Sequence, residues 1–177
     1  KPRIFRLEED GALINRLGFN NDGMEIIKNR IKSQDKNGIL GINIGPNKNT
    51  KDQKNDFILG LKNFFDIADY IVVNISSPNT KDLRNFHDQE KLEDLLLALN
   101  KIKKDSKEDT PLLLKISPDI KDNDISKIVE VATKNNISAI ILTNTTDGNR
   151  DNLLSKKKKE QGGLSGKPLQ TISTNLI

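Results

Sequence analysis

Amide and hydroxyl side chains gather between residues 74 and 80, where the apolar run Tyr70–Ile75 ends. An amide offers both donors and an acceptor, and a hydroxyl also does both, so such a set suits a small planar molecule rich in hydrogen-bonding groups. A turn that only connects two elements does not need this many polar groups. The segment therefore predicts a small-molecule site that includes Asn74, Ser76, Ser77, Asn79 and Thr80.

Three further apolar runs also carry polar residues at their ends. They are Asn43 in the run 39–44, Lys115 in the run 112–116, and Thr143, Asn144 and Thr145 in and after the run 139–143. In a parallel barrel the carboxyl ends of all strands open on the same face, where catalytic groups gather. We therefore expect these side chains to share one face with the segment 74–80.

Lys115 stands inside the apolar sequence Leu-Leu-Leu-Lys-Ile. A lysine is costly to bury without an anionic partner. The residue is predicted either to form an inward ion pair or extend its stem to solvent, or to face an anionic cofactor or intermediate. The amide-rich strand ends beside it favour the cofactor.

The elements that position these residues follow from the same runs. Nearly continuous apolar runs are typical of strands buried on both faces of a parallel sheet, and helical patterns lie between them at about 51–66, 88–104 and 121–135. Asp122 or Asp124 is predicted to open the third helix, and Asn135–Asn136 to close it. The order predicts an α/β fold, either part of a (β/α)8 barrel or a doubly wound sheet.

Three other polar segments have local interpretations. Asn15–Asn20 is predicted to be a turn with a helix N-cap, and Gln161–Pro168 a glycine-rich loop before a helix. Lys156–Lys159 is predicted to be a solvated, mobile loop tip. His87, the single histidine, is predicted to have a surface or capping role.

Composition excludes several classes of function. The chain has 177 residues, no cysteine and a net charge of +4 from well-mixed charges, and only 4% of its residues are aromatic. These values argue against a disulfide or thiolate metal site, and against a nucleic-acid-binding surface. No apolar stretch approaches the roughly 20 residues of a membrane-spanning helix. We expect one domain without a metal.

Six ordered motifs resemble the dihydroorotate dehydrogenase family over essentially the whole chain. The segment 74–80 resembles the active-site strand and loop of that family. Its serine, Ser77, stands where the quinone-reducing class 2 branch has its catalytic base, whereas class 1 enzymes and dihydropyrimidine dehydrogenases have a cysteine there. The other motifs are Pro2–Leu7 with Asn15–Asn20, Leu40–Lys48, Leu114–Asp119, Thr143–Thr146 and Gly162–Leu169.

The resemblance implies a partial (β/α)8 TIM barrel that covers roughly strands three to six. Residues 1–177 would then belong to a single FMN-binding barrel domain, truncated at both ends. Membrane association would come from an N-terminal segment outside the chain. The implied location is peripheral on the bacterial inner membrane, or on the mitochondrial inner membrane in a eukaryote.

The implied reaction oxidises dihydroorotate to orotate in pyrimidine biosynthesis, with FMN as cofactor and a quinone as electron acceptor. Ser77 would accept the proton, and Thr80 and Phe19 would shape its relay. Substrate contacts are implied for Asn15, Arg16, Leu17, Gly18, Phe19, Asn74, Asn79, Asn144 and Thr145, and FMN contacts for Asn43, Asn74, Lys115, Thr143 and Gly166.

Two alternatives remain open at this point. The asparagine set could hold another pyrimidine in a different FMN-dependent oxidoreductase. The chain could also be an incomplete barrel with exposed sheet edges, inactive by itself.

Overall fold

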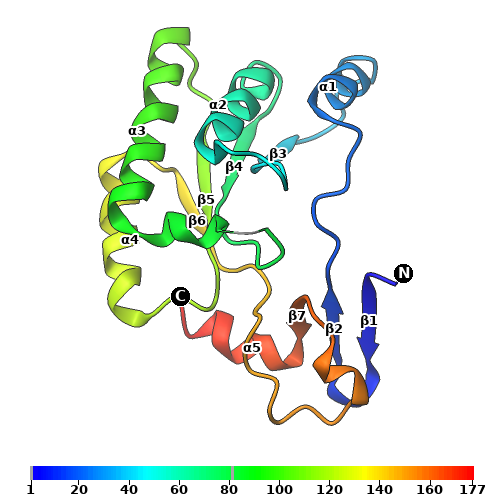
Figure 1. Ribbon diagram of the computed structural model, residues 1–177. Helices are drawn as coiled ribbons and strands as arrows, with labels where there is room; N and C mark the ends of the chain where they lie inside the picture. Colours follow the sequence, from blue (N-terminus) through cyan, green and yellow to red (C-terminus); the bar gives the residue numbers. More distant parts are fainter. Residues whose placement is uncertain (1, 81) are drawn as a thin grey trace.

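Four parallel strands form the larger of two sheets in the computed structural model, which describes residues 2–80 and 82–177 (Figure 1). The strands are hydrogen-bonded in chain order. Each lies within one of the apolar runs, so the four predicted strands are confirmed, each slightly shorter than the run. Their bounds are β3 (Gly41–Ile44), β4 (Tyr70–Asn74), β5 (Leu112–Lys115) and β6 (Ala139–Ile141).

Helices alternate with these strands, and α2, α3 and α4 lie side by side along one face of the sheet (Figure 1). The three predicted helical patterns correspond to these helices. A further helix lies before β3, after the segment 15–20 that was predicted to be a turn with a helix N-cap, but the N-cap of this helix is Gly23. Another helix follows the glycine-rich segment near residue 163, as expected. The bounds are α1 (Met24–Lys32), α2 (Gln53–Phe64), α3 (Gln89–Ser106), α4 (Asp122–Lys134) and α5 (Lys167–Thr174).

Aspartates cap two of the helices. The Asp52 side chain accepts a hydrogen bond from the Asn55 backbone N–H at the start of α2, at 2.9 Å. Asp88 does the same for α3. Asp122 or Asp124 was predicted to open α4, and the helix begins at Asp122 and has Asn135 as its C-cap, as predicted. Asp124 lies inside the first turn, where its backbone N–H bonds to the Lys121 carbonyl at 2.8 Å.

The strand register divides the larger sheet into two faces. Side chains alternate along a strand, and aligned residues of parallel strands point to the same side. Asn74 is aligned with Lys115, and Asn43 with Val72, two residues before Asn74. Asn43, Asn74 and Lys115 therefore share one face. The alternate residues pack in the main hydrophobic core with the helices: Ile44, Ile71, Val73, Leu112 and Leu114.

A second, antiparallel sheet was not predicted. It joins β1 (Ile4–Leu7), β2 (Ala12–Asn15) and β7 (Gly163–Gly166) in that order, and it lies below and to the right of the parallel sheet in Figure 1. Two expectations are thereby corrected. The predicted turn begins only after Asn15, which ends β2, and the predicted glycine-rich loop contains a strand. Gly166 fits closely there, since a Cβ on it would lie 2.4 Å from the Gly11 carbonyl oxygen.

Short 3-10 helices occupy three connections: η1 (Glu8–Asp10), η2 (Leu83–His87) and η3 (Lys156–Lys159). The segment predicted as a solvated, mobile loop tip is η3. Lys158 Nζ donates hydrogen bonds to the carbonyls of Leu153 and Asp151, at 2.8 and 3.1 Å. The segment is therefore a helical turn and not an irregular loop, whereas Lys156, Lys157 and Lys159 are exposed, as predicted. Its mobility stays a prediction.

The two outer strands of the parallel sheet each pair on one side only within the described part of the chain. The central β4 is buried from Ile71 to Asn74, whereas β3 and β6 carry exposed residues such as Asn43 and Ala139. Across residues 2–80 and 82–177, no helix has the length and apolar character needed to cross a membrane. The same residues contain no cluster of three or more acidic, histidine or cysteine side chains that could hold a metal.

Candidate active site

Ser76 connects the carboxyl ends of β4 and β6. Its backbone N–H and its hydroxyl both donate hydrogen bonds to Asn74 Oδ1, at 3.2 and 2.7 Å. Its Oγ accepts a hydrogen bond from Asn144 Nδ2 at 2.9 Å. Asn144 Oδ1 in turn accepts from the Thr145 backbone N–H at 2.7 Å. The structure thus joins three of the predicted substrate residues in one network.

These hydrogen bonds fix which atom of each amide is the oxygen and which is the nitrogen. A backbone N–H can only donate, so the atom it meets on Asn74 and on Asn144 must be the carbonyl oxygen. The nitrogen ends are thereby left to donate. Asn74 Nδ2 makes no hydrogen bond within the described residues, and Asn144 Nδ2 uses one of its two N–H groups on Ser76. The site therefore presents donors to a ligand rich in acceptors.

Ser77 lies directly beside this network and is almost fully buried, with 6% of its surface exposed. Its Oγ accepts a hydrogen bond from the Asn79 backbone N–H at 3.2 Å. The Asn79 side chain reaches across to the Asn15 carbonyl at the end of β2, at 3.4 Å. Thr80 is buried at the end of the same loop. The loop therefore brings Ser77, Asn79 and Asn15 together, as the sequence predicted.

Gly163 lets β7 pack closely over the site. A Cβ at this position would lie 1.9 Å from Thr145 Oγ1 and 3.3 Å from Pro78 Cγ. Only a glycine therefore fits here without displacing Thr145. The second sheet thus positions a predicted substrate residue, which the sequence did not indicate.

Phe19 and Asn43 lie on a different side of the site. They line a cavity of about 220 Å³ with Asn20, Asn21 and Gly45. The Phe19 ring packs against Gly45, directly after β3, and the Phe19 backbone has a left-handed φ of 57°. Gly45 also lies near β4, because a Cβ atom added to Gly45 would be 3.8 Å from the Asn74 backbone carbonyl oxygen.

Lys115 is half-buried on the same face as its aligned neighbour Asn74. It forms no ion pair or hydrogen bond within the described part of the chain. The predicted inward ion pair is therefore absent there. Thr143, also half-buried, donates its hydroxyl to the Asn144 carbonyl at 2.9 Å. A cation and neighbouring amides on one face can hold an anionic cofactor.

Other predicted contact residues lie in the second sheet or the segment after it. Arg16 pairs with Glu160 at 2.9 Å, and its guanidinium lies 4.5 Å from the centre of the Phe5 ring. Leu17 is exposed, Gly18 has a positive φ, and Gly166 is exposed beside Gly11. The structure gives Arg16 bonds within the chain, and ligand roles for these residues stay predictions.

Arg84 is the residue near the site that the sequence interpretation missed. From η2 it reaches the segments that follow β4, β5 and β6, through Ser76, Asp119 and Asp147. A usable signal was present, since Asp119 and Asp147 end or follow two of the polar motifs. Acidic residues at such positions call for a cationic partner.

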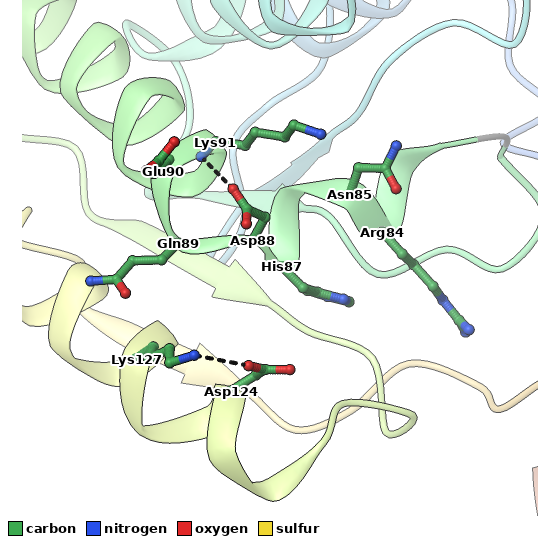
Figure 2. A pocket seen from close by; sticks show the side chains of 9 residues that line it. All are labelled: Arg84, Asn85, His87, Asp88, Gln89, Glu90, Lys91, Asp124 and Lys127. Carbon is green, nitrogen blue, oxygen red and sulfur yellow. Dashed lines mark hydrogen bonds and ion pairs between the residues drawn. The ribbon is translucent and has the colours of Figure 1, made fainter.

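A larger cavity, of about 570 Å³, lies between η2 and α4 (Figure 2). None of the predicted catalytic, substrate or cofactor residues lines it, so its size does not mark it as the reaction site. His87 projects from η2 here, and its Nε2 is buried without a hydrogen-bond partner among the described residues. Burial, assisted by the charge of Arg84, lowers the pKa of His87 to about 4. The predicted capping role is therefore wrong, because Asp88 is the cap of α3, and His87 is half-buried in the wall of this cavity.

The family model and the curated relatives that match this chain all carry the name dihydroorotate dehydrogenase. The family model described as dihydroorotate dehydrogenase matches residues 1–177. A curated dihydroorotate dehydrogenase (quinone) from Christiangramia forsetii is 48% identical over 179 residues, which are 100% of this chain and 52% of that protein. The protein of the same name from Idiomarina loihiensis is 44% identical and is covered over 54% of its length. The chain thus spans about half the length of these relatives.

Solved structures support the same fold. The ligand-free dihydroorotate dehydrogenase of Eimeria tenella superposes with a TM-score of 0.91 at 35% identity, over 100% of this chain and 56% of that one. The complex of the Eimeria tenella enzyme with ferulenol gives a TM-score of 0.93 at 34% identity, over 54% of its chain. The predicted partial (β/α)8 barrel is confirmed, and the doubly wound alternative is set aside.

Proposed function

Because the chain belongs to the dihydroorotate dehydrogenase family, we propose that the protein oxidises dihydroorotate to orotate and passes the electrons to a quinone. The names of the relatives support the quinone as acceptor. The step would belong to pyrimidine biosynthesis. Since the chain spans about half of each relative, the activity is assigned to the protein as encoded in full.

One observation carries this proposal: the fixed orientation of Asn74 and Asn144, which both bond to Ser76, next to Ser77 in the chain. Backbone N–H groups occupy the oxygens of both amides, which leaves their nitrogen ends to donate to an acceptor. Dihydroorotate presents ring carbonyls and a carboxylate, which are acceptors. Fixed donors of this kind orient a substrate and reject analogues without the matching polar edge. Asn79, Asn15 and Thr145 complete the proposed substrate set.

FMN fits the residues on the same face of the sheet. The half-buried Lys115 has no anionic partner within the described chain, and Asn43, Asn74 and Thr143 lie on or near the face that it shares. These side chains would hold the flavin, and Lys115 would stabilise negative charge on it. When bound, FMN supplies the acceptor for the substrate hydride. Gly166 stands further away, in the second sheet, so its contact with FMN has less support.

Ser77 is proposed to accept the proton that leaves the substrate carbon C5. A serine hydroxyl is a weak base at its ordinary pKa, so Ser77 Oγ must pass its own proton onward as it accepts the new one. The Asn79 backbone N–H holds Oγ in place. The buried Thr80 hydroxyl is the proposed next member of the relay, and Phe19 is proposed to exclude other solvent. The low exposure of Ser77 and Thr80 supports a relay shielded from bulk water.

The deciding experiment uses the protein as encoded in full. The purified protein is mixed with dihydroorotate without oxygen, and the flavin absorbance is followed before and after a quinone is added. Rapid bleaching that the quinone reverses is the expected result. Bound flavin that dihydroorotate leaves oxidised but another pyrimidine bleaches would move the substrate to that pyrimidine. A full-length protein without any flavin would overturn the enzymatic proposal.

We also propose that the protein acts at the surface of the bacterial inner membrane, or of the mitochondrial inner membrane in a eukaryote. The proposed electron acceptor supports this location, because a lipid-soluble quinone is dissolved in the bilayer. Fractionation of the full protein tests this. Recovery with membranes, and release by detergent, is expected. Recovery only with the soluble fraction would contradict it.

A further inference from the structure

Arg84 bonds to the segments that follow three neighbouring parallel strands. Its Nε donates to the Ser76 carbonyl after β4 at 3.3 Å, and its second terminal nitrogen donates to the Thr145 carbonyl after β6 at 3.4 Å. The first terminal nitrogen lies 3.0 Å from Asp119 Oδ2 after β5 and 2.9 Å from Asp147 Oδ1 after β6. One guanidinium therefore ties the ends of β4, β5 and β6 together.

The partners of Arg84 are themselves fixed. Asp119 accepts hydrogen bonds from the Thr146 hydroxyl and, at 3.2 Å, from the Asp147 backbone N–H. The side chains of Arg84 and Asp119 are mostly buried, at 23% and 26% exposure, so solvent screens their attraction less than on an open surface. Burial alone would raise the pKa of Asp147, but hydrogen bonds within the cluster and the Arg84 charge outweigh it and lower that pKa.

The hydrogen bond from Arg84 to the Ser76 carbonyl lies next to Ser77, the proposed base. The Ser76 carbonyl belongs to the peptide group that leads into Ser77, and the N–H and Oγ of Ser76 are already held by Asn74 and Asn144. Arg84 is the contact on the remaining polar group of Ser76. Its second carbonyl contact, on Thr145, lies in the segment that carries the substrate amide Asn144. Both halves of the substrate site therefore depend on one side chain.

We propose that Arg84 is a positioning residue that holds Ser77 and the Asn144–Thr145 segment in their working geometry. The role of this geometry in the reaction rests on the proposed function. Arg84 acts through these two segments, because all of its bonds are to Ser76, Asp119, Thr145 and Asp147. A lysine cannot replace it, because a single ammonium group lacks the planar fork that meets two carbonyls and two carboxylates at once.

The test compares Arg84→Lys, Asp119→Asn and a matched control in the protein as encoded in full. The control is Lys134→Ala, which removes an exposed ion pair with Glu93 away from the site. The rate of flavin reduction by dihydroorotate, per bound flavin, should fall about ten- to a hundredfold in Arg84→Lys, because small displacements of reacting groups are costly. The rate should also fall in Asp119→Asn, and the rate of the control should equal that of the unaltered protein.

Two further readouts separate positioning from a general loss of structure. Amide hydrogen exchange should become faster for residues 76–80 and 144–148 in Arg84→Lys, while exchange in α2 stays unchanged. In Arg84→Ala, added guanidinium ion at millimolar concentration should restore part of the reduction rate. If Arg84→Ala does not fold, the reduction rates of Arg84→Lys and Asp119→Asn still test whether Arg84 positions the two segments.

The outcomes distinguish this inference from the proposed function. If dihydroorotate does not reduce the unaltered protein, the proposed function fails, and the exchange data still decide whether Arg84 holds the two segments. If the unaltered protein is reduced but Arg84→Lys reacts at the same rate with unchanged exchange, the positioning role is overturned. A reduction rate that falls only in proportion to lost flavin would also overturn it.

Discussion

Ser77 is positioned by contacts on both sides of it in the chain. Asn79 donates its backbone N–H to Ser77 Oγ, and Ser76 is bonded through all of its polar groups. The sequence indicated Ser77 and the amides, because polar side chains follow an apolar strand there. It did not indicate Arg84, since its partners Asp119 and Asp147 lie 35 residues or more away along the chain. Only the fold brings them to one guanidinium.

Ser77→Ala tests the proposed base. Removing the hydroxyl should lower the rate of flavin reduction by dihydroorotate by about a hundred- to ten-thousandfold, the usual contribution of general base catalysis. Rapid mixing with absorbance detection measures it, and the flavin content should stay normal. The control is Ser138→Ala, an exposed serine before β6. An unchanged rate in Ser77→Ala would exclude Ser77 as the base.

His87 predicts a pH dependence of stability. The pKa of His87 is about 4 in the folded protein and 6.5 in the unfolded chain, so the unfolded state binds more protons between these values. The stabilisation is fully present above pH 6.5 and is lost as the pH falls toward 4. In the unaltered protein, the protonation of His87 should therefore lower the unfolding free energy by about 2 kcal/mol between pH 7.5 and pH 5.

The variant His87→Gln has no titrating group at this position and should lack that part of the pH dependence. Urea unfolding at pH 7.5 and at pH 5, for both proteins, measures the difference. The quantity compared is the change in unfolding free energy between the two pH values, so other titrating groups cancel. Equal changes in the two proteins would show that His87 is not buried in its neutral form.

At the scale of elements, the parallel strands and α2 to α4 were predictable because their apolar residues are arranged locally. The stripe Leu92, Leu95, Leu96 and Leu99 specifies α3, and all four side chains are buried. The strand β7 was not predictable from its own sequence, which contains two glycines and one apolar residue, Leu164. Its conformation comes from pairing with β2, a partner far away in the chain.

Gly163→Ala tests the packing of β7 against the site. The added methyl group would overlap Thr145 Oγ1, and rotation of Thr145 would break its hydroxyl contact with Asn144 at 3.3 Å. We expect a loss of about 2 kcal/mol in unfolding free energy, and a higher KM for dihydroorotate. Urea unfolding and steady-state kinetics measure the two effects.

The matched control is Gly148→Ala. A methyl group at that position would approach Thr146 Oγ1 at 3.6 Å, which is ordinary van der Waals contact. It should change stability and KM little. If Gly163→Ala behaved like this control, the close packing of β7 on Thr145 would not matter to the site.

At the scale of the whole molecule, the chain contains one side of a barrel wall. Both outer strands, β3 and β6, have a row of backbone groups without a strand partner in the described chain. Ile39, just before β3, is 83% exposed. Unpaired edges of this kind promote association between molecules. Exposed edges were one of the two alternatives that the sequence left open, because the resemblance implied a partial barrel of roughly strands three to six.

Residues 1–177 expressed by themselves should therefore associate as their concentration rises. Sedimentation at several protein concentrations measures this, and the protein as encoded in full is the comparison. The isolated chain should also retain little flavin, because one wall of a barrel surrounds the cofactor incompletely. A monomeric isolated chain with a full complement of flavin would contradict both expectations.

The pairing of β2 with β7 also affects when the site can form during synthesis. The Ser165 hydroxyl bonds to the Leu13 carbonyl across 152 positions of sequence, and β7 presses Thr145 into place. Contacts of such long range form late, because the chain entropy lost in closing the intervening loop must be overcome first. While the ribosome makes the chain, Asn15 and Thr145 can take up their final contacts only after β7 has emerged. A nascent chain that stops before residue 163 would hold a folded helical layer but no assembled substrate site.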